Sequence, residues 1–370
     1  MSVPGLENVI ASETAISYLD VEKEEIVLRG YDLIVLANNV TYLDIAGLLL
    51  DGELPTPEER HSLEVKIKSE CGLPRNIQAI FQLLPKQANM MDVLRTGVSA
   101  LASYDEELDD RSKDANKRKA IRLLAKVPQI VANGFQAINN QPLIEPRKEL
   151  SYTANFLYMI TGNVPSRMEE EVFDQSLIAY SEHELPNSTF AARVIASTQS
   201  DLYGALTGAI ASLKGTLHGG ANEAVMHMLL EAQTEDDLER LMQKKLSQKE
   251  RIMGFGHRVY MRKADPRALL MKEALVNLAA VKNAKELYDR CVIGEQVMKR
   301  EKNLYPNLDY YAAPVFHLLG IPIDLFTPVF LAARTIGISA HVMEQHGNNR
   351  LFRPRVLYNG PRNLHPPTKQ

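Results

Sequence analysis

Cysteine is scarce in this chain of 370 residues, and tryptophan is absent. The two cysteines, Cys71 and Cys291, cannot supply the disulfide framework that stabilises small secreted proteins, nor a zinc site made of thiolates alone. Few cysteines are usual in a reducing compartment, and we expect a cytoplasmic protein. The first residues contain neither a basic segment nor an apolar run, so a secretory signal is not expected.

Long apolar runs are also missing. The richest segment, 312–333, is interrupted by His317, Asp324 and prolines, and it falls short of the roughly 18 apolar residues of a membrane span. The net charge of −4 gives no bulk attraction to nucleic acid or to an anionic membrane. We therefore expect neither as a partner. The length leaves room for about two or three domains.

The small net charge conceals two basic segments. Residues 251–267 hold five cations and one acid, and residues 334–370 hold six cations and one acid. Grouped arginines bind carboxylates in a bidentate way, which favours a small di- or tricarboxylate over nucleic acid. Glycines beside the cations of the first segment also suit a phosphorylated ligand. A solvated basic loop is the alternative there.

Strand signals are confined to the N-terminus, where 16–20 and 25–29 flank a polar tetrapeptide and predict a hairpin. The rest of the chain carries helix signals. Thr56-Pro57-Glu58-Glu59 predicts a capping box with proline at the first helical position. Asp265-Pro266 repeats the cap and proline, and Thr234 precedes three acids. The predicted fold is mainly α.

The segment from Ser188 to Leu213 contains no proline and predicts one long helix of about seven turns. Every fourth residue along it is small: Ser188, Ala192, Ala196, Ser200, Gly204, Gly208 and Ser212. Such a ridge lets another helix pack closely, which offsets the cost of about 0.8 to 1 kcal/mol for each mid-helix glycine. The pattern leaves open whether the partner helix belongs to the same chain or to a second subunit.

Two histidines, His218 and His257, lie in glycine-rich motifs. His218 lies between the predicted long helix and the start of the next one, whose partial positive charge disfavours imidazolium. A neutral histidine there can donate a hydrogen bond to a developing oxyanion. His257 follows Gly254-Phe255-Gly256 in the first basic segment. A structural loop histidine is the alternative at position 218.

Two further groups are candidates for chemistry. His183 lies between acids just before the predicted long helix, where charged neighbours either raise its pKa or solvate it. Asp309 follows a turn at the predicted start of a helix, among apolar and aromatic residues. It is a candidate base, and a helix N-cap is the alternative.

Four motifs occur in an order and at spacings that resemble those of citrate synthases. They are Thr216-Leu217-His218-Gly219-Gly220-Ala221-Asn222-Glu223, Gly254-Phe255-Gly256-His257-Arg258, Asp265-Pro266-Arg267 and Tyr305-Pro306-Asn307-Leu308-Asp309. The resemblance runs from Gly5 to Tyr358, and in overall similarity the chain most resembles bacterial 2-methylcitrate synthases.

This resemblance implies a citrate synthase-like, mostly α-helical homodimer. A large domain would comprise residues 1–219 and 319–370, and a small domain residues 220–318, with the active site in the cleft between them. The implied reaction joins propionyl-CoA, oxaloacetate and water to give 2-methylcitrate and CoA, a step of propionate metabolism, with some activity on acetyl-CoA. The alternative is a dedicated citrate synthase of the tricarboxylic acid cycle. The CoA thioester is a cosubstrate, and the resemblance implies no tightly bound cofactor and no metal.

The resemblance also implies residue roles. Asp309 matches the base that removes the α-proton of the acyl-CoA, His218 the neutral electrophile at the thioester oxygen, and His257 the acid at the keto carbonyl of oxaloacetate. The implied oxaloacetate ligands are His183, Arg267, Arg334 and Arg353, with Asn187 at a nearby polar position and Arg353 supplied by the neighbouring subunit. The implied CoA site comprises Arg251, Ile252, Met253, Gly254, Phe255, Gly256, Arg258 and Arg262.

The chain differs from the family pattern in places. Relative to the animal enzymes, one residue is inserted between His257 and Arg267, and one is deleted between Arg334 and Arg353. The N-terminal extension of the NADH-regulated bacterial type is missing, so that regulation is not implied.

Two other classes of function stay open from the residues alone. A metal-dependent hydrolase would use some of His218, His257, His341, Glu344 and His346, although positions 341 and 346 do not share a helical face. A helical dimerisation scaffold would rest on the ridge of small residues.

Overall fold

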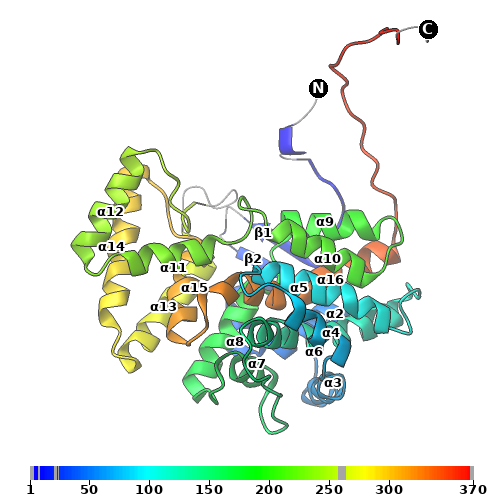
Figure 1. The fold of residues 1–370 in the computed structure, drawn as a ribbon, viewed down its shortest axis with the longest axis horizontal. Coiled ribbons are helices and arrows are strands. Elements are labelled where there is room, and N and C mark those ends of the chain that lie inside the picture. The colour runs from blue at the N-terminus through cyan, green and yellow to red at the C-terminus, as the bar shows by residue number, and fades with distance from the viewer. Residues whose placement is uncertain (1–3, 7–8, 21–22, 24, 257–263, 367–370) are drawn as a thin grey trace.

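The computed structural model describes residues 4–6, 9–20, 23, 25–256 and 264–366. Within these residues the protein is built almost entirely of helices, with one small sheet near the N-terminus (Figure 1). The prediction of a mainly α fold is confirmed.

The predicted hairpin is present, and a third strand extends it. β1 (Ser17–Asp20) pairs antiparallel with β2 (Glu25–Leu28), and β2 pairs with the two-residue β3 (Tyr31–Asp32). Between β2 and β3 the chain turns through Arg29 and Gly30, whose φ angles are 49° and 91°. We did not predict β3, because two residues are too few to show the alternation of a strand.

The helices follow in chain order. The first eight are α1 (Leu33–Asn39), α2 (Tyr42–Asp51), α3 (Pro57–Ser69), α4 (Arg75–Leu83), α5 (Met90–Leu101), α6 (Lys113–Ile138), α7 (Tyr152–Thr161) and α8 (Arg167–Ser181). The second eight are α9 (Asn187–Ala196), α10 (Leu202–Leu213), α11 (Ala221–Glu231), α12 (Glu235–Ser247), α13 (Pro266–Val281), α14 (Lys285–Lys302), α15 (Leu308–Leu318) and α16 (Phe326–Gly347). Single 3₁₀ turns span Pro4–Leu6, Ala102–Tyr104 and Ile323–Leu325.

The three predicted helix starts are confirmed by their capping contacts. Thr56 and Glu59 form a reciprocal capping box at α3, with Pro57 at its first position. Thr234 forms the same box at α12, and Asp265 caps α13 through its side chain. Each cap satisfies main-chain N–H groups that the helix itself leaves without partners.

The prediction of one long helix over 188–213 is wrong, because a polar run breaks it into α9 and α10. The side chain of Ser197 bonds back to the carbonyl of Val194, and Gln199 has a φ of 67°. Asp201 then caps α10 by accepting a hydrogen bond from the N–H of Gly204 at 2.8 Å. Short polar side chains that bond to the nearby main chain compete with helix continuation, which explains the break.

The two halves of the predicted helix fold back on each other. α9 packs along α10, and a Cβ on Gly208 would collide with the side chain of Ile195. At this point of the small-residue ridge, the partner helix therefore belongs to the same chain.

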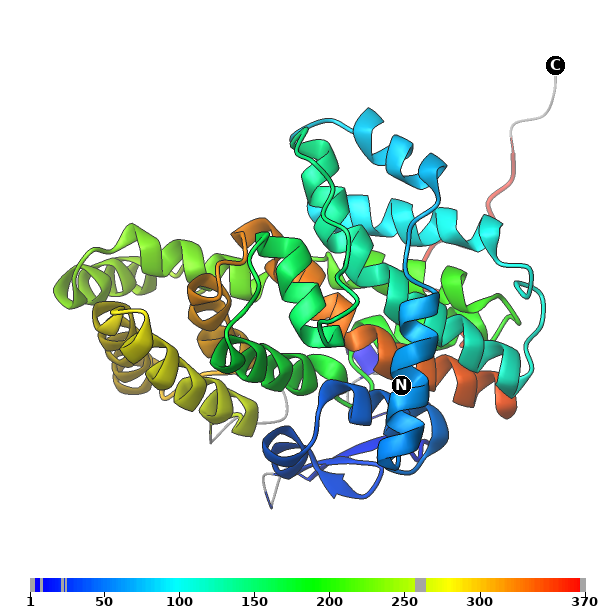
Figure 2. The ribbon, with the colours of Figure 1, turned by 90° about the horizontal axis from the view of Figure 1, so that it is seen from below.

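The longest apolar segment is the central helix of the core. α16 packs against α2, α5, α6, α8, α9 and α10, and it runs through the body as the orange to red helix in Figure 2. The stretch Ile323–Gly347 is long and apolar enough by composition to cross a membrane, which we had not expected of any segment. However, 89% of its most apolar window is buried inside the protein, and this burial accounts for the composition.

Helices α11 to α15 lie together on one side of the molecule, drawn in lime, yellow and orange in Figure 1. α12 packs on α14, and α15 packs on both α11 and α13. α8, from the other side, contacts α13 and α15, and its last turn meets the start of α15 through Tyr180 and Asp309. Side chains from distant parts of the sequence meet at this junction.

Candidate active site

Asp309 lies in the first turn of α15 but does not cap it. Asn307 is the cap, and its side-chain oxygen accepts the N–H of Asp309 at 3.1 Å. The N-cap alternative for Asp309 is therefore wrong. Its carboxylate oxygen Oδ1 instead accepts a hydrogen bond from the hydroxyl of Tyr180, at 2.7 Å, in the last turn of α8.

Opposing influences act on the Asp309 carboxyl. Burial raises its pKa above the ordinary range, because a charged group is poorly solvated there. The Tyr180 hydroxyl and the positive charges of Arg267 and Arg334 act in the opposite direction, while Asp265 adds to the rise. A perturbed carboxyl among cations is a frequent property of functional sites.

The glycine-framed loop 251–256 is attached to the start of α15. The N–H of Gly256 donates to the carbonyl of Tyr305, and the N–H of Asn307 donates to that of Gly254, both at 2.9 Å. Gly254 has a φ of 87°, and a Cβ there would meet the ring of Tyr310. Glycine is needed at this position for both conformation and space.

The side chains of this loop differ in exposure. Ile252 and Phe255 are buried, and the ring of Phe255 lies 4.4 Å from that of Tyr310. Arg251 is exposed. His257, Arg258 and Arg262, which belong to the predicted acid and CoA site, lie outside the described residues.

His218 precedes α11 and contacts the start of α9. Its Nε2 atom accepts the main-chain N–H of Ser188 at 3.1 Å and lies 2.9 Å from the hydroxyl of the same residue. A main-chain N–H can only donate, so Nε2 carries the lone pair and the ring proton lies on Nδ1. Burial, aided by the charge of Arg334, lowers the pKa of His218 to about 4, against a hydrogen bond to its own main chain that raises it. The ring is neutral near pH 7, as predicted.

Two buried arginines lie near the Asp309 carboxyl. Arg334 on α16 donates from Nε to the main-chain carbonyl of Tyr180, and its guanidinium lies 4.9 Å from the ring centroid of Phe330. Burial and the charge of Arg267 lower the pKa of Arg334 to about 10, against Glu182, Tyr180 and Asp309, which raise it. Arg267, in the first turn of α13, forms a bidentate pair with Asp265 at 2.7 and 3.0 Å. Two adjacent buried guanidiniums suit a ligand with two carboxylates.

The remaining predicted ligands are more scattered. His183 is buried in the segment between α8 and α9. Asn187 is exposed at the first position of α9, where its oxygen accepts a hydrogen bond from Ser212 at 2.5 Å. Arg353 is exposed in the C-terminal segment, which extends away from the body of the molecule (Figure 1). Within one chain, the structure does not bring Arg353 to the other predicted residues.

The histidines of the metal-site alternative are engaged elsewhere. His341 contacts Arg193 through Nδ1 and Glu182 through Nε2, each at 3.0 Å. His346 contacts Asn116 and the carbonyl of Ser200 through its two nitrogens. Across the described ranges, no three His, Cys, Asp or Glu side chains are grouped to hold a metal ion.

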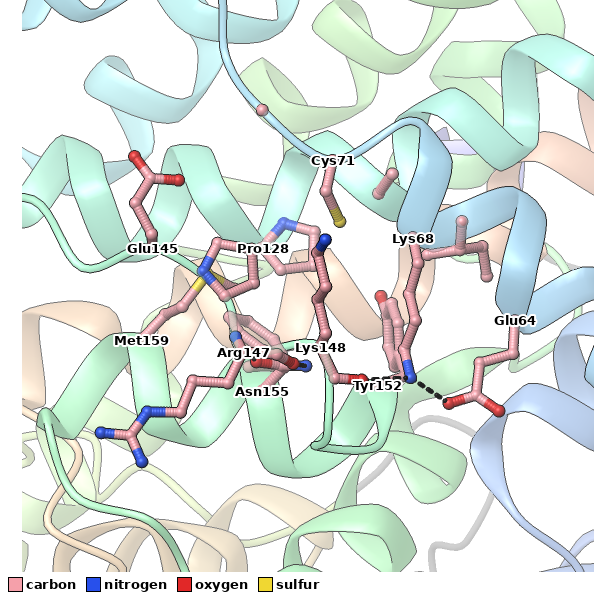
Figure 3. Close-up of a pocket in the computed structure, with 15 residues that line it drawn as sticks. Glu64, Lys68, Cys71, Pro128, Glu145, Arg147, Lys148, Tyr152, Asn155 and Met159 are labelled. Atoms are coloured by element: carbon pink, nitrogen blue, oxygen red, sulfur yellow. Dashed lines mark hydrogen bonds and ion pairs between the residues drawn. The ribbon is translucent and has the colours of Figure 1, made fainter.

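A separate cavity of about 220 Å³ lies between α3, α6 and α7 (Figure 3). Pro128, in the middle of α6, lines the cavity, as do Lys68 of α3 and Lys148 of the segment before α7. Proline cannot donate to the carbonyl of Leu124, and the hydroxyl of Tyr152 does so instead at 3.1 Å. None of the predicted site residues lines this cavity.

Sequence reasoning missed Tyr180 and Ser188. The signal that was available is their position, because they flank the predicted ligand His183 by three and five residues. Nothing in their own surroundings distinguishes a functional tyrosine or serine from a structural one.

Comparison with known proteins identifies the family to which this chain is similar. Residues 5–355 match the family model described as "Citrate synthase, C-terminal domain". The chain is 61% identical over 359 residues to the citrate/2-methylcitrate synthase of Bacillus subtilis (strain 168), covering 97% of this chain and 96% of that protein. It is 60% identical to the citrate synthase of Heyndrickxia coagulans, covering 98% and 97% of the two chains.

A solved structure matches as well. It is the ternary complex of carboxymethyl coenzyme A and oxaloacetate with the citrate synthase of Thermoplasma acidophilum, with a TM-score of 0.92, 30% sequence identity and 98% coverage of both chains. The chain therefore belongs to the citrate synthase family, whose enzymes are acyltransferases that condense a coenzyme A thioester with oxaloacetate.

Proposed function

We propose that this enzyme is a 2-methylcitrate synthase of propionate metabolism that also accepts acetyl-CoA. The observation that supports a dual activity is the name of the Bacillus subtilis relative, which covers both products. The Heyndrickxia coagulans relative, named for citrate alone, supports a dedicated citrate synthase of the tricarboxylic acid cycle as the second candidate.

The acyl preference is tested by thiol release with both thioesters at limiting concentration. The two substrates differ by one methylene, and an apolar pocket discriminates such a difference by about 1 to 3 kcal/mol, or roughly 10- to 200-fold. We expect a higher kcat/KM with propionyl-CoA than with acetyl-CoA. A higher value with acetyl-CoA would support the second candidate instead.

In the proposed mechanism, Asp309 removes the α-proton of the acyl-CoA. The observation that carries this assignment is that Asn307 caps α15, which leaves the Asp309 carboxylate available at the junction of α8, α13 and α15. The C–H electrons move to the thioester oxygen as the proton moves to the carboxylate. A weakly acidic C–H needs both a base and a partner for the developing oxyanion.

His218 is the proposed partner of that oxyanion. Because Nε2 accepts from Ser188, the ring donor is Nδ1–H. In the proposed mechanism this N–H turns from the main chain of His218, to which it bonds here, to the thioester oxygen. The pKa of about 4 keeps the ring neutral, so that it stabilises the enolate by a hydrogen bond rather than by full proton transfer. His257 is the proposed acid that polarises the keto carbonyl of oxaloacetate as the new carbon–carbon bond forms. Hydrolysis of the resulting thioester releases CoA.

The proposed oxaloacetate site is formed by His183, Arg267 and Arg334, with Asn187 nearby. Burial makes the charged Arg334 costly, and a substrate carboxylate would supply compensating charge there. Arg267 is already paired with Asp265 and would share its guanidinium with the second substrate carboxylate. Arg353 would come from the partner subunit of a homodimer, which its exposed position in an extended C-terminal segment supports.

We assign residues 1–219 and 319–370 to a large domain and residues 220–318 to a small one. The clustering of α11 to α15 on one side of the molecule supports this division. The proposed CoA thioester contacts are the 251–256 loop, Arg258 and Arg262. The proposed compartment is the cytoplasm, and no resident cofactor or metal is part of the proposal.

A further inference from the structure

The side chain of Tyr180 is fixed by aromatic packing. It is 1% exposed, and its ring lies 4.4 Å from that of Phe330 on α16 and 6.0 Å from that of Phe316 on α15. A tilted ring held between two helices has little freedom to rotate. The hydroxyl is consequently held at one place in the junction.

The hydroxyl and the main chain of Tyr180 serve different groups of the site. The O–H lies 2.7 Å from Oδ1 of Asp309, and the carbonyl accepts the Nε–H of Arg334. Among the described residues, Tyr180 is the one whose side chain donates a hydrogen bond to the Asp309 carboxylate. Tyr180, at the end of α8, thus contacts both the proposed base and Arg334, a residue proposed to bind the substrate.

The direction of the Tyr180 hydroxyl proton follows from its partner. An ionised carboxylate can only accept hydrogen bonds, so the hydroxyl donates its proton to Oδ1 of Asp309. Burial and the charge of Asp309 raise the pKa of Tyr180 well above its ordinary value, so the hydroxyl keeps its proton.

The proposed base needs such a donor. In the part of the chain that the structure describes, the groups that act on the Asp309 carboxyl are Tyr180 from α8, Arg267 and Asp265 from the start of α13, and Arg334 from α16. Burial favours the neutral carboxyl, whereas a base must be ionised before the proton arrives. A hydrogen bond from Tyr180 stabilises the ionised form and occupies one of its two oxygens.

We propose that Tyr180 is a positioning residue for Asp309: its hydroxyl holds Oδ1, which leaves Oδ2 to receive the α-proton of the acyl-CoA. The inference rests on the proposed role of Asp309 as the base. No bond forms to Tyr180 during the reaction. The proton passes from the α-carbon to Oδ2, the C–H electron pair passes to the thioester, and Tyr180 keeps its own proton.

The test is Tyr180→Phe, which keeps the ring and removes the hydroxyl. We expect kcat for thiol release to fall by about ten- to a hundredfold, with KM for oxaloacetate within about twofold, because Asp309 is misplaced after substrate has bound. The acid limb of the kcat/KM profile should move to higher pH, since the carboxylate loses a donor that favours its ionised form. A purely structural role would not move this limb.

Tyr42→Phe is the matched control. Tyr42 is fully buried, and its hydroxyl donates to the main-chain carbonyl of Ala333 at 2.8 Å, away from Asp309. We expect this variant to lose stability but to keep the wild-type kcat and acid limb. Wild-type kcat together with a wild-type acid limb in Tyr180→Phe would overturn the proposal.

Two additions keep the result decisive. Asp309→Asn is assayed in parallel: near-normal turnover there means that the proposed base is wrong, whereas an inactive Asp309→Asn beside an unaltered Tyr180→Phe means that only the positioning role is wrong. If Tyr180→Phe does not fold, 3,5-difluorotyrosine is placed at position 180. Its more acidic hydroxyl is a stronger donor, and we expect the acid limb to move to lower pH; an unmoved limb contradicts the proposal.

Discussion

Two clusters of buried polar and charged side chains differ in how their members are paired. In the first, Arg193 donates to His341, Gln345 and Glu344, and His341 also contacts Glu182. These contacts use the three guanidinium nitrogens and both ring nitrogens. All of these partners belong to one chain.

The second cluster lies near the junction of α8, α13 and α15 and holds groups whose pKa values are shifted. The pKa of His218 is lowered to about 4 and that of Arg334 to about 10, while that of Asp309 is raised, in each case chiefly by burial. Charges satisfied by protein partners stabilise a fold, whereas buried groups with shifted pKa values are frequent in functional sites. We therefore interpret the first cluster as a structural network and propose the second as the reaction site.

Glu182 connects the two regions. Its Oε1 accepts from Ser17 of β1 and contacts His341. Burial would raise its pKa, but His341, Arg334 and Ser17 hold it below the ordinary value. This carboxylate is thus charged at neutral pH. It partly balances the charge of the Arg334 guanidinium in the second cluster.

The largest expected effect on stability comes from breaking the structural network. Arg193→Met leaves Glu344 and His341 without their buried partner, and we expect a loss of about 3 to 5 kcal/mol in the free energy of unfolding. The measurement is denaturant unfolding at one fixed protein concentration, because subunit association would shift the midpoint. Turnover by the folded fraction should stay within a few-fold of wild type.

A matched control for this prediction is Arg60→Met. The Arg60 guanidinium pairs with Asp44 at 3.3 Å and is 43% exposed. The Asp44 carboxylate is buried but also accepts hydrogen bonds from the main-chain N–H and the hydroxyl of Thr41, so we expect a loss of only about 1 kcal/mol. Equal losses in the two arginine variants would contradict the distinction between a buried network and a partly exposed pair.

A smaller expected effect is the partial recovery of activity when two inactive variants are mixed. Such recovery would show that one chain alone does not supply the whole proposed active site. Asp309→Asn and Arg353→Ala should each be nearly inactive as homodimers. In a mixed dimer, one site keeps its own Asp309 and receives Arg353 from the Asp309→Asn subunit. We expect refolded mixtures to recover up to about a quarter of wild-type turnover, because about half of the dimers are mixed and each has one intact site.

Absence of recovery, with mixed dimers shown to form by mass spectrometry, would place Arg353 in the site of its own chain.

Sequence reasoning predicted the features that depend on local chemistry. The capping residues Thr56, Thr234 and Asp265 and the N-terminal hairpin follow from neighbours in the chain, and the structure confirms them. The neutral state of His218 was expected from the adjacent helix start, but burial and the charge of the distant Arg334 are what lower its pKa. The family match also decides against the hydrolase and scaffold alternatives.

Features that depend on distant contacts were missed. The break between α9 and α10 becomes favourable because Gly208 then packs against Ile195, a contact that the small-residue ridge alone does not specify. Tyr180 gains its importance from Asp309, which lies 129 positions away. The hydrogen bond exists because α8 ends where α15 begins, and no local pattern encodes that meeting.

The most direct test of the account is Asp309→Asn, measured for both ligand binding and turnover. The amide is nearly isosteric with the carboxylate but cannot accept the α-proton. Calorimetry should show oxaloacetate binding close to wild type, whereas thiol release from either thioester should fall by several orders of magnitude. Near-normal thiol release by this variant would contradict the assignment of Asp309 as the base and of the α8–α15 junction as the reaction site.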